Sequence, residues 1–189
     1  MPDNPLSDRG RSLEDDFFRK QDQELIEKMR RAAAADKTRQ HLTASTGLQD
    51  PALIAEVQAL GFSPETVALL PLVPLIEVAW AEGGVSDAER ALVVELARSR
   101  GIAEGSAANR ELKEWLRARP TAEMFARANR LVRAMLTAAT PDSPAITADD
   151  LVKYSESIAA ASGGIFGMNK VSAEERALLE RIAAELKGR

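Results

Sequence analysis

The sequence predicts an all-α protein, a helical bundle of about seven helices with an internal two-fold repeat, preceded by a long N-terminal amphipathic helix. Three observations lead to this prediction. Alanine and leucine supply most of an apolar content of 45%, whereas aromatic residues make up only 4%, and such a composition favours helices over sheets. Helix-capping residues recur along the chain, and one helix-start pattern occurs twice. We therefore expect about eight helices and no strand.

The composition also excludes several classes of protein. The chain has 189 residues and no cysteine, which excludes disulfides, thiolate zinc sites, iron–sulfur clusters and cysteine nucleophiles. Its formal net charge is −4, and a mildly acidic chain is a poor general ligand for nucleic acid. We expect no specific nucleic-acid partner.

Two features of hydropathy predict a cytoplasmic location. The first residues contain no apolar segment of the kind that a signal peptide needs. The longest apolar run, residues 67–81, is interrupted by Pro71, Pro74 and Glu77 and is shorter than the roughly 20 residues of a membrane-spanning helix.

A charged helix is predicted from Ser12 to about Leu42. Phe18, Leu25 and Met29 recur at spacings that place them in one apolar stripe. Phe17, Ile26 and Ala33 widen this stripe. A helix of this kind is marginally stable alone and must bury its apolar face, so we expect a protein partner or self-association through Phe17, Phe18, Leu25 and Met29.

The segment after this helix, residues 43–47, has the Thr/Ser/Gly composition of a linker. The predicted organisation is therefore an N-terminal helix and linker over residues 1–47 and a helical bundle over residues 48–189.

Helix signals are frequent in the predicted bundle. Asp50 caps a helix that has Pro51 at its first position and ends at Gly61. The next helix starts at Ser63, runs to Ala81 and is apolar nearly all round, which predicts a central position and a break at its prolines. Further caps are Ser106 and Thr121, and the capping boxes pair Ser86 with Glu89, Thr147 with Asp150 and Ser172 with Glu175.

A repeat is the strongest internal signal. Residues 85–97 align with residues 171–183 at seven identical positions of thirteen, and residues 78–84 align with 158–164. The second copy carries six extra residues, 165–170. Capping accounts for the shared Gly, Ser and Glu but not for the shared Val, Arg, Ala and Leu, so we interpret the pattern as a duplication.

The first copy resembles a known family. Its apolar helix ends Ala-Trp-Ala-Glu-Gly-Gly and is followed by Val-Ser-x-x-Glu-Arg, from Ala79 to Arg90, which is similar to the signature of the TerB-like domains named for bacterial tellurite resistance. The resemblance covers about residues 51–187. It implies an all-helical bundle of two similar halves, an association with stress-response complexes near the inner membrane, and use as an interaction domain.

The resemblance also implies a possible divalent-cation site, because acidic residues at this helical corner are linked to metal binding in the family. The matching positions here are Glu82, Asp87 and Glu89. Glu82 stands where the family has Asp, and the second copy has Ser162 there. From the residues alone, Glu89 is a capping carboxylate, and Glu82 and Asp87 are solvated residues of the turn. We expect no other cofactor.

Three further groups have two interpretations each. Glu77, in the most apolar segment, needs either an arginine partner or a wet edge of its helix. Ile165, Phe166 and Met168 either fold back onto the core or form an apolar tip for a partner. Arg127, Arg130 and Arg133 form either a solvated face or a contact with anionic lipid or RNA. Contact with anionic lipid would be a peripheral membrane contact.

No constellation of residues predicts an enzyme, since the only histidine, His41, ends a charged helix. The sequence predicts a non-enzymatic interaction or scaffold module of a bacterial stress-response type, docking partners through its N-terminal helix and bundle surface. The alternative is a divalent-cation sensor that uses Glu82, Asp87 and Glu89.

Overall fold

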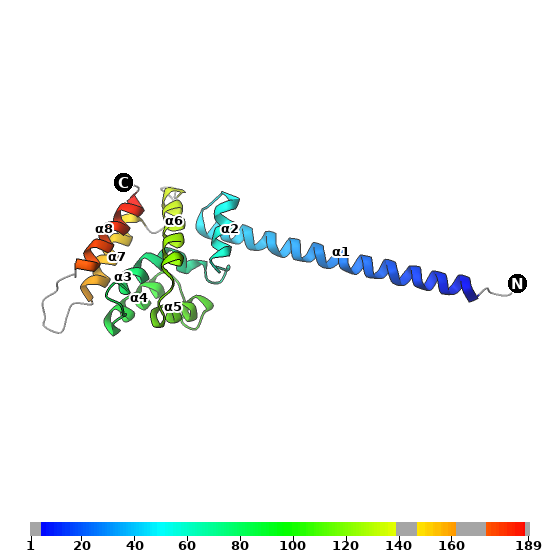
Figure 1. The fold of residues 1–189 in the computed structure, drawn as a ribbon, viewed down its shortest axis with the longest axis horizontal. Helices are drawn as coiled ribbons and strands as arrows, with labels where there is room; N and C mark the ends of the chain where they lie inside the picture. The colour runs from blue at the N-terminus through cyan, green and yellow to red at the C-terminus, as the bar shows by residue number, and fades with distance from the viewer. Residues whose placement is uncertain (1–4, 139–146, 162–172, 188–189) are drawn as a thin grey trace. The chain divides into compact units, whose positions relative to one another are not determined.

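The computed structural model describes residues 5–138, 147–161 and 173–187, and it describes side chains over 18–138, 147–161 and 176–184. These residues form eight α-helices and one 3₁₀ helix, with no strand among them (Figure 1). The all-α prediction is confirmed. The chain divides into two compact units, Met1–Gln40 and His41–Arg189.

Helix α1, Pro5–Thr46, is one continuous helix of 42 residues. The linker predicted over residues 43–47 is wrong, because the helix continues through Thr46 and ends at Gly47, whose φ is +73°. The Thr46 hydroxyl donates to the carbonyl of Leu42 at 2.7 Å and accepts from the amide of Leu48 at 3.3 Å. Leu42 and Leu48 are both buried in the core, so the last turn of α1 belongs to the second unit.

Helix α2, Pro51–Ala59, has the predicted start, since the Asp50 carboxylate accepts from the amide of Ala52 at 2.8 Å. The apolar segment after it is divided as predicted, into the 3₁₀ helix η1, Val67–Leu72, and helix α3, Val73–Ala79. Pro71 lies inside η1 and Pro74 lies in the first turn of α3, where a missing amide proton costs nothing. Every residue of α3 is buried, which confirms its central position.

Five helices complete the chain, and they are α4 Asp87–Ser99, α5 Ala107–Arg117, α6 Ala122–Ala138, α7 Ala148–Ala161 and α8 Ala173–Lys187. The predicted caps Ser86, Ser106, Thr121 and Thr147 each accept a hydrogen bond from the amide three residues later. Local side-chain chemistry therefore sets these helix starts. The predicted cap Ser172 lies outside the described residues.

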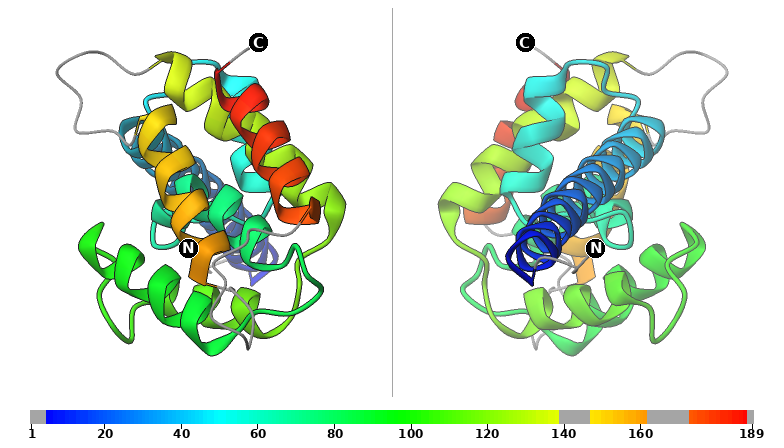
Figure 2. Two further views of the ribbon diagram at one scale, coloured as in Figure 1. Left: turned by 90° about the vertical axis from the view of Figure 1, so that its left-hand side faces the viewer. Right: turned by 90° about the vertical axis from the view of Figure 1, so that its right-hand side faces the viewer.

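Helix α3 contacts η1, α4, α6, α7 and α8, and α7 contacts α4 and α8. Figure 2 shows α7 and α8, in orange and red, next to each other, and both contact α3. The two aligned copies are thus two helix pairs, α3 with α4 and α7 with α8. Equivalent positions are buried in both, namely Val78 with Ile158, Ala79 with Ala159 and Leu96 with Ile182.

Candidate interaction surfaces

Four large hydrophobic side chains on α1 are exposed, and we call them the α1 patch. Phe18 is 59% exposed, Leu25 56%, Ile26 47% and Met29 63%. Among the side chains that the structure describes, these four are the large hydrophobic ones classed as exposed. The side chain of Phe17, which was also predicted on this face, is not among those described.

The surroundings of the α1 patch are charged and solvated. All side chains from residue 18 to residue 37 are exposed. Two ion pairs lie within the helix, from Arg31 to Glu27 at 3.0 Å and from Arg39 to Asp36 at 3.1 Å. Such exposed pairs add little stability. Leu25, Ile26 and Met29 lie among these charged side chains and are each about half exposed or more.

The acidic corner between α3 and α4 does not gather its carboxylates. Glu82 and Asp87 are exposed, whereas Glu89 is only 3% exposed. One oxygen of Glu89 accepts from the amide of Ser86 at 2.7 Å, and the Ser86 hydroxyl accepts from the amide of Glu89 at 3.2 Å. This is a reciprocal capping box. Over the described part of the chain, no three acidic, histidine or cysteine side chains are grouped to hold a metal ion.

The same corner is fastened to the end of α5. The indole Nε1 of Trp80 donates to the carbonyl of Trp115 at 2.8 Å, and the guanidinium of Arg90 donates to the carbonyl of Leu116 at 3.0 Å. Both carbonyls lie in the last turn of α5, where backbone carbonyls lack amide donors within their own helix. Trp80 and Arg90 thus have a structural role that the sequence did not predict.

Glu77 is the centre of a polar cluster inside the bundle, which we call the Glu77 node. It is 7% exposed and accepts from Nδ2 of Asn129 at 2.7 Å and from the guanidinium of Arg181 at 2.5 Å. The expected arginine partner is confirmed. The node joins α3, α6 and α8, and it satisfies a carboxylate that would be costly to bury alone.

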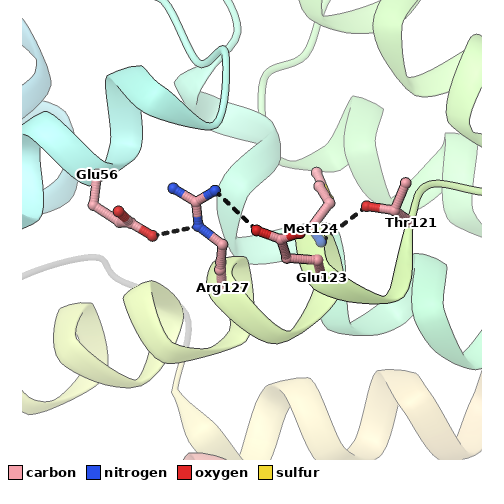
Figure 3. A network of polar contacts seen from close by, with 5 residues as sticks. All are labelled: Glu56, Thr121, Glu123, Met124 and Arg127. Atoms are coloured by element: carbon pink, nitrogen blue, oxygen red, sulfur yellow. Dashed lines mark hydrogen bonds and ion pairs between the residues drawn. The ribbon is translucent and has the colours of Figure 1, made fainter.

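The predicted arginine stripe on α6 divides into two parts. Arg127 is half-buried, and its Nε donates to Glu56 of α2 at 2.6 Å while its NH1 lies 3.5 Å from Glu123 (Figure 3). The hydrogen bond from Arg127 is the main cause that lowers the pKa of the Glu56 carboxyl. Arg130 and Arg133 are exposed. Arg127 therefore links α2 to α6, and the other two remain on the surface.

The third predicted surface, Ile165, Phe166 and Met168, lies outside the described residues. In the part of the chain that is described, no helix has the length and apolar character to cross a membrane. Comparisons of the chain with family models, with curated proteins and with solved structures found no match.

Proposed function

We propose that this protein is a non-enzymatic interaction module of the TerB-like, stress-response type, in which the helical bundle is the scaffold and α1 binds a protein partner. The observation that carries the proposal is the α1 patch. Leu25, Ile26 and Met29 are each about half exposed or more on a helix whose side chains are solvated from residue 18 to residue 37.

An exposed apolar face of this kind has a physical cost. Helices in water gain most of their stability from packing an apolar face against another element, and the described part of the first unit consists of α1 alone. Clustered exposed apolar side chains mark binding surfaces more often than isolated ones do. Leu25 and Met29 are four residues apart and therefore lie on the same side of the helix.

The TerB-like part of the proposal rests on the motif from Ala79 to Arg90 and on the two helix pairs. The motif lies at the corner between α3 and α4, and the equivalent residues of α7 and α8 are buried at matching positions. The Glu77 node joins α3, α6 and α8 inside this bundle, which supports a role as a scaffold.

The test compares two full-length double variants as baits in extracts of the native host. L25Q/M29Q makes the α1 patch polar, and K20Q/E27Q places two glutamines on the opposite face without changing the net charge. The wild type and K20Q/E27Q should retain the same partner, and L25Q/M29Q should lose at least 90% of it. Circular dichroism should show equal helix content in the three proteins.

The proposal is overturned if L25Q/M29Q retains its partners and its oligomeric state as the wild type does. Binding of the wild type to anionic lipid vesicles, lost at high salt, would assign the face to a membrane surface and would also overturn it.

A further inference from the structure

We propose that the occupant of the α1 patch is a second copy of this chain, and that the two α1 helices pair antiparallel. This inference rests on the proposed function, since it names the partner of the same surface. It is carried by the way charge and apolar side chains are distributed along the helix.

The charge of α1 changes sign in the middle of the helix. Residues 5–27 contain seven acidic and four basic residues, whereas residues 28–40 contain one acidic and five basic residues. Glu14, Asp15 and Asp16 form the densest acidic group, and Lys28, Arg30 and Arg31 form the densest basic group. Each copy thus offers an acidic segment with a net charge of −3 and a basic segment with a net charge of +4.

The helix dipole does not account for this arrangement. Charges interact favourably with the dipole only within the first and last turns of a helix. Glu27 and Lys28, where the sign changes, lie 18 residues or more from either end of α1. The charge pattern therefore requires another explanation, and a partner with the opposite order of charges supplies one.

The apolar residues set an antiparallel register, and the charged segments agree with it. The α1 patch runs from Phe18 to Met29, so its midpoint lies between residues 23 and 24. Two antiparallel copies that cross at this midpoint place Phe18 opposite Met29. The same crossing lays the acidic group of each copy, residues 14–16, beside residues 31–33 of the other copy, next to its basic group at residues 28–31. Apolar burial and the proximity of opposite charges both favour this crossing.

A parallel pair has the opposite outcome. It would align the acidic segment of one copy with the acidic segment of the other, and the basic segments likewise, and like charges at close range oppose association. A two-fold antiparallel arrangement closes on itself, which is the commonest symmetry of homodimers.

The first experiment measures the mass of the full-length protein by analytical ultracentrifugation over a concentration series. The wild type should approach twice the chain mass of 20.5 kDa. The variants K28E/R30E/R31E and E14K/D15K/D16K should each weaken self-association at least tenfold, because each makes the two ends of α1 alike in charge. An equimolar mixture of the two should regain the dimer mass. The control K113E/R117E/R119E, which reverses three exposed bases of the bundle, should dimerise as the wild type does.

The second experiment determines the relative orientation of the two α1 helices. The chain has no native cysteine that could form a competing disulfide. F18C and M29C are prepared as separate full-length proteins, mixed and oxidised. Antiparallel pairing predicts the mixed F18C–M29C disulfide, because position 18 of one copy then lies opposite position 29 of the other. Position 18 of one copy and position 18 of the other are then 11 residues apart, which is about 16 Å along the helices. Disulfides need Cβ atoms within about 4.5 Å. Disulfides between identical positions in preference to mixed ones would overturn the antiparallel arrangement.

The two proposals fail in different ways. A wild type that stays at the single-chain mass at every concentration overturns self-pairing. If L25Q/M29Q then still loses a host protein that the wild type captures, the interaction function stands without the second copy. If neither a dimer nor a captured partner depends on the α1 patch, both proposals are overturned.

Discussion

Asn129 donates a 2.7 Å hydrogen bond to the carboxylate of Glu77, although 52 residues separate them in the chain. Glu77 lies in α3, the buried centre of the bundle, and Asn129 lies in α6 and is 4% exposed. Arg181 binds the other carboxylate oxygen from α8. This contact therefore fixes the relative positions of three helices around one charged group.

Removing Asn129 should destabilise the bundle. Asn129→Ala leaves one oxygen of a buried carboxylate without its donor, and hydrogen bonds to charged groups contribute about 1.5–3 kcal/mol to the free energy of unfolding. The matched control is Arg133→Ala on the exposed side of α6, which should change that free energy by less than about 0.5 kcal/mol. Urea unfolding at neutral pH measures both. Equal effects of the two substitutions would contradict the role of the Glu77 node.

Two leucines of α1 should differ sharply in their effect on stability. Leu42 is fully buried in the core of the second unit, whereas Leu25 is 56% exposed. Leu42→Ala should lower the free energy of unfolding by about 2–5 kcal/mol because it leaves a cavity. Leu25→Ala should change the stability of the bundle by less than about 0.5 kcal/mol. Thermal and urea unfolding give the values, and a mild effect at Leu42 would show that the end of α1 is not part of the core.

The contribution of the Ser86 cap to the free energy of unfolding should be measurable with a single substitution. Ser86→Ala removes the hydroxyl that accepts from the Glu89 amide, and losing such a cap costs about 0.5–2 kcal/mol of unfolding free energy. Ser157→Ala, on the exposed side of α7, removes a hydroxyl that caps no helix. Its stability should equal that of the wild type or exceed it slightly. A loss at Ser157 as large as the loss at Ser86 would argue against capping.

Glu56 should make stability depend on pH in the acid range. Its folded pKa lies below the ordinary value of 4.5, chiefly because Arg127 donates a hydrogen bond to it. The stabilisation is therefore fully present above pH 4.5 and is lost as the pH falls through the folded pKa. Glu56→Gln should show a smaller loss of unfolding free energy between neutral pH and pH values below 4.5 than the wild type shows. Identical pH profiles would contradict the Glu56–Arg127 contact. Glu65 and Asp150 also have lowered pKa values, so the variant should keep part of the dependence.

The sequence predicted the features that depend on neighbouring residues. Ser86, Ser106, Thr121 and Thr147 were all identified as caps because a cap acts on an amide only three residues away. The burial of α3 was predictable for a similar reason, since a segment that is apolar all round has no face for water. The all-α class follows from the sum of such local signals.

The sequence could not identify contacts between residues that are far apart in the chain. The need of Glu77 for a partner was clear, but Arg181 lies 104 residues away, and no local pattern identifies it. The linker prediction failed because Thr and Ser are common in loops and yet tolerated in helices. The hydroxyl of Thr46 donates a hydrogen bond to the carbonyl of Leu42 within the helix. Leu42 and Leu48, on either side of Thr46, are buried in the core and hold this turn in place.

The Glu77 node also bears on how the two halves of the bundle could have evolved. The carboxylate belongs to the first copy and its arginine belongs to the second, while the equivalent positions hold Ser157 in the second and Glu95 in the first. The contact between the two copies is therefore made once, and the equivalent residues do not make a second such pair. A recombination event that discarded the second copy, or replaced it with the first, would leave the buried carboxylate of Glu77 without its arginine partner. The two aligned helix pairs are therefore expected to be inherited as a single unit, because one supplies the buried carboxylate and the other supplies its arginine.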